Sequence, residues 1–190
     1  LPNADPVHKV SIVARGMIGG YTRQLPTEDR YMLTRSQFND MLAVLLGGRA
    51  AEELVYREMT TGSENDIERA TKIARKMVTE YGMSLNLGPR TFGHKEELIF
   101  LGREISEQRN YGDKIADKID AEVDSLIETA HHIAVKILTE RRAKLEQIAR
   151  RLIAEETIEG EELEKVFNEP IPETKETPAP TLQAAPASSS

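Results

Sequence analysis

The four histidines are the first candidates for metal chemistry, because the 190-residue chain contains no cysteine. Any zinc site must therefore use His, Asp or Glu as ligands. His131 and His132 are adjacent, and adjacent side chains on a helix point about 100° apart, which is a poor arrangement for chelating one ion. We predict that this pair lies at the surface or flank of a helix.

The other two histidines do not complete a site either. His8 falls on the apolar face of an alternating segment, which favours a hydrogen-bonded core histidine over a ligand. His94 has Glu97 three residues on, but no second histidine completes a metal motif. A zinc hydrolase needs three protein ligands and a carboxylate that takes the proton of the bound water. The sequence contains no His-Glu-x-x-His, no defensible Ser-His-Asp arrangement and no Gly-x-x-x-x-Gly-Lys-Ser/Thr nucleotide loop.

The elements that carry these residues are predicted to be mainly helical, with a small β-hairpin near the N-terminus. Alternation across residues 7–25, with glycines at the bend, predicts the hairpin. Thr34 and Gln37 form a capping box before a helix over about 35–57. Gly47 and Gly48 inside it cost roughly 1 kcal/mol each, so we expect another backbone to pack closely there.

A second capping box, Ser63 with Asp66, predicts a helix that stops near Gly82. Residues 83–102 are interpreted as a loop with one short extended segment at 98–101.

The C-terminal third shows two more helical stripes. One runs from 113 to about 139 and the other includes 145–152. The short break between them predicts an antiparallel helical pair, the core of a C-terminal bundle. A short helix is expected over 161–167. The Pro, Ala and Ser-rich residues 170–190 are expected to be disordered.

Length and composition fit one domain, residues 1–169, followed by that tail. The net charge of −7 argues against a nucleic-acid surface. The longest apolar stretch, 41–46, is far below the roughly 18 residues needed to cross a bilayer. Because the chain starts with Leu1 and carries no signal peptide, we expect it to continue a longer protein.

Several separated segments together resemble the peptidase domain of the FtsH family of ATP-dependent zinc metalloproteases. They occur in the family's order over about residues 1–168: 5–10 (DPVHKV), 45–53 (LLGGRAAEE), 60–71 (TTGSENDIERAT), 78–83 (VTEYGM) and 103–111 (REISEQRNY). The resemblance implies a membrane-bound homo-hexamer in which an AAA ATPase domain, using ATP, feeds unfolded polypeptides to a zinc peptidase domain on the cytoplasmic side of the membrane. The family's His-Glu-x-x-His helix, with two zinc ligands and the general base, would lie upstream of Leu1.

The resemblance also implies roles for residues of this chain. Asp66 corresponds to the family's third zinc ligand, and it also fits the acidic position of the capping box. Glu52 corresponds to a Glu near the zinc that would orient a zinc-bound His, with a plain salt bridge as the alternative. Gly20, Tyr21 and Thr22 begin a segment that resembles the strand lining the substrate cleft, with ordinary hairpin packing as the alternative.

The resemblance predicts a zinc metallopeptidase domain that is incomplete at its N-terminus, with no catalytic residue of its own and one zinc ligand. The isolated chain is therefore expected to be inactive. The alternative is an oligomerisation or interaction module of a hexameric protease ring without catalysis of its own.

Overall fold

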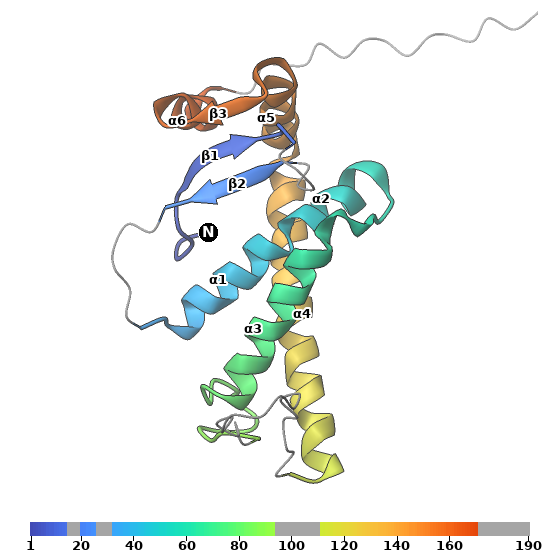
Figure 1. Ribbon diagram of the computed structural model, residues 1–190. Helices are drawn as coiled ribbons and strands as arrows, with labels where there is room; N and C mark the ends of the chain where they lie inside the picture. Colours follow the sequence, from blue (N-terminus) through green and yellow to red (C-terminus); the bar gives the residue numbers. More distant parts are fainter. Residues whose placement is uncertain (15–19, 26–31, 94–110, 171–190) are drawn as a thin grey trace, which may run out of the picture.

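The computed structural model describes residues 1–14, 20–25, 32–93 and 111–170. Most of these residues are helical, and a small antiparallel sheet lies at one end of the helices (Figure 1). The predicted fold class is confirmed in this respect. The expected extended segment at 98–101, His94 with Glu97, and residues 171–190 of the tail predicted to be disordered over 170–190 lie outside the described residues.

The sheet joins the predicted hairpin to a strand that the sequence pattern did not reveal. Strands β1 (Val7–Ser11) and β2 (Tyr21–Gln24) pair antiparallel, which confirms the hairpin. The third strand, β3 (Thr157–Glu159), pairs with the other side of β1, so the order is β2-β1-β3. Lys9 and Glu159 face each other across this pair with a 2.6 Å ion pair, which lowers the pKa of Glu159.

The prediction for His8 is wrong, because its side chain is exposed. The register between β1 and β2 is interrupted between Val7 and Lys9, so the alternation assumed from the sequence does not hold. Val7 and Val10, three residues apart, both pack on the same apolar cluster. The irregularity therefore leaves His8 facing solvent.

The single helix predicted over 35–57 is two helices, α1 (Arg35–Leu45) and α2 (Gly47–Tyr56). They meet at Leu46, whose ψ of −4° departs from the helical value. Gly47 and Gly48, weak helix formers, follow at once, which explains why the bend falls there. The capping box of Thr34 and Gln37 at the start of α1 is confirmed.

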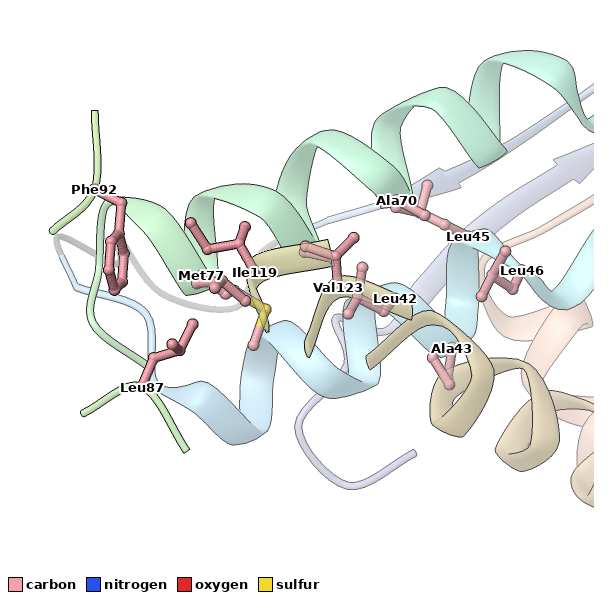
Figure 2. Packing of buried hydrophobic residues seen from close by; sticks show 13 residues of the cluster. Leu42, Ala43, Leu45, Leu46, Ala70, Met77, Leu87, Phe92, Ile119 and Val123 are labelled. Atoms are coloured by element: carbon pink, nitrogen blue, oxygen red, sulfur yellow. The ribbon is translucent and has the colours of Figure 1, made fainter. Parts of the chain in front are cut away.

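Helix α3 (Glu64–Thr79) runs antiparallel to the long helix α4 (Asp113–Glu140), α1 packs on both of them, and α2 packs on α4 (Figure 1). Arg75 near the end of α3 pairs with Asp120 near the start of α4 at 3.4 Å. The opposite end of α3, where Asp66 lies, is therefore directed toward the C-terminal half of α4. Figure 2 shows the fully buried side chains that meet between these helices, among them Leu42, Met77 and Ile119.

Residues 83–93 contain no helix or strand, as predicted for this part of the loop. They are fixed on α4 by Ser84, whose hydroxyl donates to Glu122 Oε2 at 2.7 Å and accepts from the backbone N–H of Leu87. Leu87 and Phe92 are buried against the helical cluster. The loop thus closes the end of the α3–α4 pair that is remote from Asp66.

Helices α5 (Arg142–Glu155) and α6 (Glu161–Asn168) follow, and the antiparallel pair predicted from the stripes at 113–139 and 145–152 does not form. The two helices touch only around their junction at Arg141, and they do not lie side by side. The chain therefore does not fold back, and α5 lies beyond the end of α4 (Figure 1).

The apolar side of α5 packs on the sheet and α6 instead of on α4. These residues form a second cluster, separate from the one between α1, α3 and α4: Ile148, Leu152, Ile158, Leu163 and Val166, with Val7 and Val10. Lys144 strengthens the contact, because its Nζ donates to the carbonyls of Val166 and Glu169 at the end of α6, at 3.1 and 2.6 Å.

Among the helices of the described ranges, none combines the length and hydropathy required of a bilayer-spanning segment.

Candidate metal centre

The candidate residues Glu52 and Asp66 lie on two helices joined by one short connection. Glu52 is on α2, and Asp66 is in the first turn of α3. Between them the chain leaves α2 at Arg57, in the left-handed region with φ 55°, and forms the single 3₁₀ turn η1 (Thr61–Ser63). The connection therefore determines how the first turn of α3 stands relative to α2.

Glu52 holds this connection directly. Its carboxylate accepts two hydrogen bonds from Thr60: the hydroxyl donates to Oε1 at 2.6 Å and the backbone N–H to Oε2 at 3.1 Å. The Thr60 hydroxyl bond, followed by the backbone bond and the nearby Arg49 charge, lowers the pKa of Glu52. Glu52 is therefore ionised near neutral pH and anchors the residues that lead into α3.

The predicted capping box of Ser63 and Asp66 does not form. Ser63 precedes α3 with φ −95° and ψ 8°, and its side chain makes no capping hydrogen bond. Because η1 runs straight into α3, the Ser63 backbone is already turned before the helix begins, and the extended geometry of a capping residue is lost. Its hydroxyl oxygen is buried and has no hydrogen-bond partner among the described residues.

Asp66 is consequently not held by a reciprocal cap. Its side chain is half-buried, and within the described ranges no hydrogen bond or ion pair to its carboxylate is present. Zinc accepts carboxylate oxygens as ligands, and both oxygens of Asp66 keep their lone pairs available. The carboxylate of Asp66 is therefore chemically suitable as a zinc ligand. The helix that carries it is fixed in the core one turn later, at Ala70.

His131, on α4, lies next to Glu53 of α2 without forming a metal site. Its Nε2 stands 3.2 Å from Glu53 Oε2 on α2, without the alignment of a hydrogen bond. Arg49 Nε donates to the other oxygen of Glu53 at 2.5 Å, and this bond is the main cause of the lowered pKa of Glu53. His131 is half-buried and its neighbour His132 is exposed, with the ring centroids 6.4 Å apart.

Among the described residues, no group of three or more His, Asp or Glu side chains is arranged to hold a metal ion.

The candidate substrate strand, β2, lies at an edge of the sheet in the described part of the chain. Tyr21 and Thr22 pair with Ser11 and Val10 of β1. Gly20 comes immediately before the strand, with φ +157°, and a Cβ there would stand 2.8 Å from the carbonyl oxygen of Ser11. Only glycine permits this approach, so Gly20 sets the start of β2.

We expect Gly20→Ala to lower the free energy of unfolding of the 190-residue chain by about 1–3 kcal/mol, since the added methyl must displace the β1 backbone. Urea denaturation followed by circular dichroism measures this. Gly48→Ala is the matched control, because nothing described lies within 4 Å of the added methyl and Ala favours helix. Equal stability of Gly20→Ala and the unchanged chain would contradict the expectation.

Gly47 and Gly48 do not face a neighbouring backbone within the described ranges, since no atom lies within 4 Å of a Cβ built on either. The close approach predicted for them therefore stays a prediction that concerns segments outside these residues.

Sequence reasoning missed Thr60, although a local signal was present. A Thr followed two residues later by Gly is typical of a turn in which the hydroxyl accepts the Gly N–H, and Thr60 Oγ1 accepts from Gly62 N–H at 3.1 Å. Its bond to Glu52 spans 8 positions, and no local pattern indicates it.

Comparison with known proteins identifies the class of this domain. The model of peptidase family M41 matches residues 1–166, and the chain therefore belongs to this family. It contains Glu52, Thr60 and Asp66 within the matched range.

The relatives are longer proteins with a common name. The chain is 60% identical over 185 residues, 97% of its length, to "ATP-dependent zinc metalloprotease FtsH 1" of Sphaerobacter thermophilus, of which it covers 28%. It is 60% identical over 90% of its length to the protein of the same name from Thermomicrobium roseum, covering 26%, and 55% identical over 92% to "ATP-dependent zinc metalloprotease FtsH" of Chloroflexus aggregans, covering 27%. The chain thus spans little more than a quarter of these relatives.

Proposed function

We propose that residues 1–169 form part of the zinc metallopeptidase domain of an ATP-dependent endopeptidase that degrades unfolded or membrane proteins. The observation that carries the proposal is the 60% identity over 97% of the chain to a relative named as an ATP-dependent zinc metalloprotease. In this proposal the ATP site, the membrane anchor and the remaining zinc ligands belong to parts of the parent protein outside these 190 residues.

Asp66 would supply one zinc ligand. Its half-buried carboxylate, without a hydrogen-bond donor among the described residues, supports this role. Bound zinc would polarise the scissile carbonyl and lower the pKa of a water molecule. The contribution of this chain is to present one oxygen donor from a helix that the core fixes one turn later, at Ala70.

Strand β2 would bind the substrate. Its position at the edge of the described sheet, with Thr22 and Arg23 exposed, suits an extended polypeptide that adds as a further strand. Main-chain hydrogen bonds of this kind depend little on side chains. A protease that receives many unfolded proteins would benefit from such recognition.

The parent would be a homo-hexamer anchored in a membrane, with this domain on the cytoplasmic side. Gly47 and Gly48 would then accept the close approach of the helix that carries the other zinc ligands, and none of the described residues occupies the space beside them. Glu52 remains a candidate to orient a zinc-bound His from that helix.

The isolated chain should be without activity, because a single carboxylate does not retain zinc at useful affinity. We expect the purified 190-residue chain neither to cleave casein nor to bind stoichiometric zinc, whereas the full-length protein should cleave it with ATP and lose activity with a chelator. Casein degradation and metal analysis of both proteins measure this. Chelator-sensitive cleavage by the isolated chain would contradict it, and a full-length protein without zinc would contradict the whole proposal.

The second candidate is an interaction module that assembles without catalysis. The absence of a three-ligand group among the described residues favours it for the isolated chain. Light scattering on the purified chain separates the two, because a monomer at high concentration contradicts assembly by this module alone.

A further inference from the structure

The connection between α2 and α3 is fixed by one side chain, Thr60. Its hydroxyl donates to Glu52 Oε1 at 2.6 Å and accepts from Gly62 N–H at 3.1 Å, while its own N–H donates to Glu52 Oε2 at 3.1 Å. All three hydrogen bonds involve Thr60, and their partners are the Glu52 carboxylate and the backbone of Gly62. We call these residues, Glu52, Thr60 and Gly62, the α2–α3 latch.

The latch compensates for the missing cap of α3. The first turn of a helix leaves backbone N–H groups without partners and frays unless a side chain or a preceding turn holds it. Ser63 provides no side-chain cap. What precedes the helix is η1, where Glu64 N–H donates to Thr61 O and Gly62 N–H donates to Thr60 Oγ1. The latch therefore fixes the turn that starts α3.

Space as well as bonding restricts this turn. A Cβ on Gly62 would stand 3.2 Å from Thr60 Oγ1 and 3.5 Å from Glu52 Oε1. The backbone at Gly62 is thus packed closely against the two oxygen atoms that form the Thr60–Glu52 hydrogen bond. Asp66 is four residues further on, in the first turn of α3, and any displacement of η1 moves that turn with it.

We propose that Thr60 is a positioning residue for the metal site, which holds the Asp66 carboxylate in place through the α2–α3 latch. The inference rests on the proposed role of Asp66 as a zinc ligand. It assigns Glu52 a function through Thr60 that needs no contact with a zinc-bound histidine.

The latch positions the first turn of α3 but contributes little to the global stability of the domain. Thr60 is exposed, and a solvent-exposed hydrogen bond contributes little net free energy to folding. The core that holds the body of α3, at Ala70, Ala74 and Met77, does not include any latch residue. Loss of the Thr60 hydroxyl should therefore loosen the first turn of α3 without unfolding the domain.

The test compares variants of the full-length protein. Thr60→Val removes the hydroxyl and keeps the side-chain shape, and Thr60→Ser keeps the hydroxyl. Thr61→Val is the matched control, because the adjacent Thr61 is exposed and its side chain forms no hydrogen bond among the described residues. Zinc affinity is measured by competition with a chromogenic chelator, and the melting temperature is measured on the zinc-free proteins.

We expect Thr60→Val to weaken zinc binding about 10–100-fold, the usual effect of losing a group that orients a ligand. Thr60→Ser and Thr61→Val should bind zinc as the unchanged protein does, and the zinc-free melting temperatures should agree. Unchanged zinc affinity in Thr60→Val would overturn the inference. So would equal weakening by Thr61→Val.

Glu52→Gln provides a second route to the latch, and it carries the test together with Thr60→Ser if Thr60→Val does not fold. Its effect on zinc affinity should not add fully to that of Thr60→Val, because both variants disrupt the hydrogen bond between the Thr60 hydroxyl and the Glu52 carboxylate. Full additivity would show that the two residues act separately and would overturn the inference.

Asp66→Ala separates the inference from the proposed function. If Asp66→Ala abolishes zinc binding while Thr60→Val leaves it intact, only the positioning role of Thr60 fails. If Asp66→Ala retains zinc, the ligand assignment itself fails, and the inference fails with it.

Discussion

Asp66→Ala is expected to abolish stoichiometric zinc binding in the full-length protein and to lower casein hydrolysis by at least about 100-fold, more than the loss of a residue that only orients a ligand. The physical reason is the loss of one protein oxygen donor, which no described neighbour can replace, since none is arranged with Asp66 in a metal-binding group. Metal analysis and initial rates of casein degradation measure the two effects.

Glu64→Ala serves as the control for Asp66→Ala. Glu64 is an exposed carboxylate in the same first turn of α3, so its removal changes charge and helix start without removing the proposed ligand. It should keep zinc and activity. ATP hydrolysis, which the proposed function assigns to another part of the parent, should be unchanged in both variants. Retention of zinc and hydrolytic rate by Asp66→Ala would refute the assignment.

Leu42→Ala is expected to destabilise the 190-residue chain by about 2–5 kcal/mol, the range for deleting a fully buried leucine side chain. Leu42 is 0% exposed and lies where α1, α3 and α4 meet (Figure 2). Its removal leaves a cavity between rigid helices that cannot collapse freely. The midpoint and slope of urea denaturation measure the change.

Leu85→Ala makes the same chemical change at an exposed position. Leu85 is 80% exposed in the 83–93 loop, so its truncation should alter the free energy of unfolding by no more than about 0.5 kcal/mol. Similar losses in the two variants would show that α1 does not pack on α3 and α4 as described.

Local patterns predicted the helices best. The stripes on α3 and α4 and the capping box at Thr34 follow from interactions within a few residues, and such signals are legible in a single sequence. The bend at Leu46 was not predicted, because the apolar pattern continues through it and the two glycines were interpreted as a packing feature.

Long-range pairing explains the other errors. Strand β3 has three residues, too few for an alternation pattern, and it exists because β1 offers it a partner. The packing partner of α5 was missed for the same reason, because α5 packs on β3 and its sheet. A short break after α4 favours a reversal of the chain, but the apolar side of α5 packs on the sheet and α6 and not back along α4.

The candidate site was predictable only in part. The importance of Asp66 came from family resemblance, since its spacing to Ser63 alone indicated a cap that does not form. Glu52 was selected for the same reason, and its bonds to Thr60 depend on how α2 and α3 are joined. Such contacts between a helix and the connection that follows it cannot be derived from periodicity.

The pairing of β1 with β3 has a consequence for how the protein is made. Ser11 and Thr157, whose hydroxyls lie 2.8 Å apart, are 146 positions apart in the sequence, so a ribosome must deliver almost the whole domain before this side of β1 can be covered. Until then Val7 and Val10 lack the apolar partners they have in the finished sheet. If translation stops before Thr157, one edge of β1 stays unpaired and its valines stay exposed on the nascent polypeptide. Chaperones would bind such an edge, and it would promote aggregation.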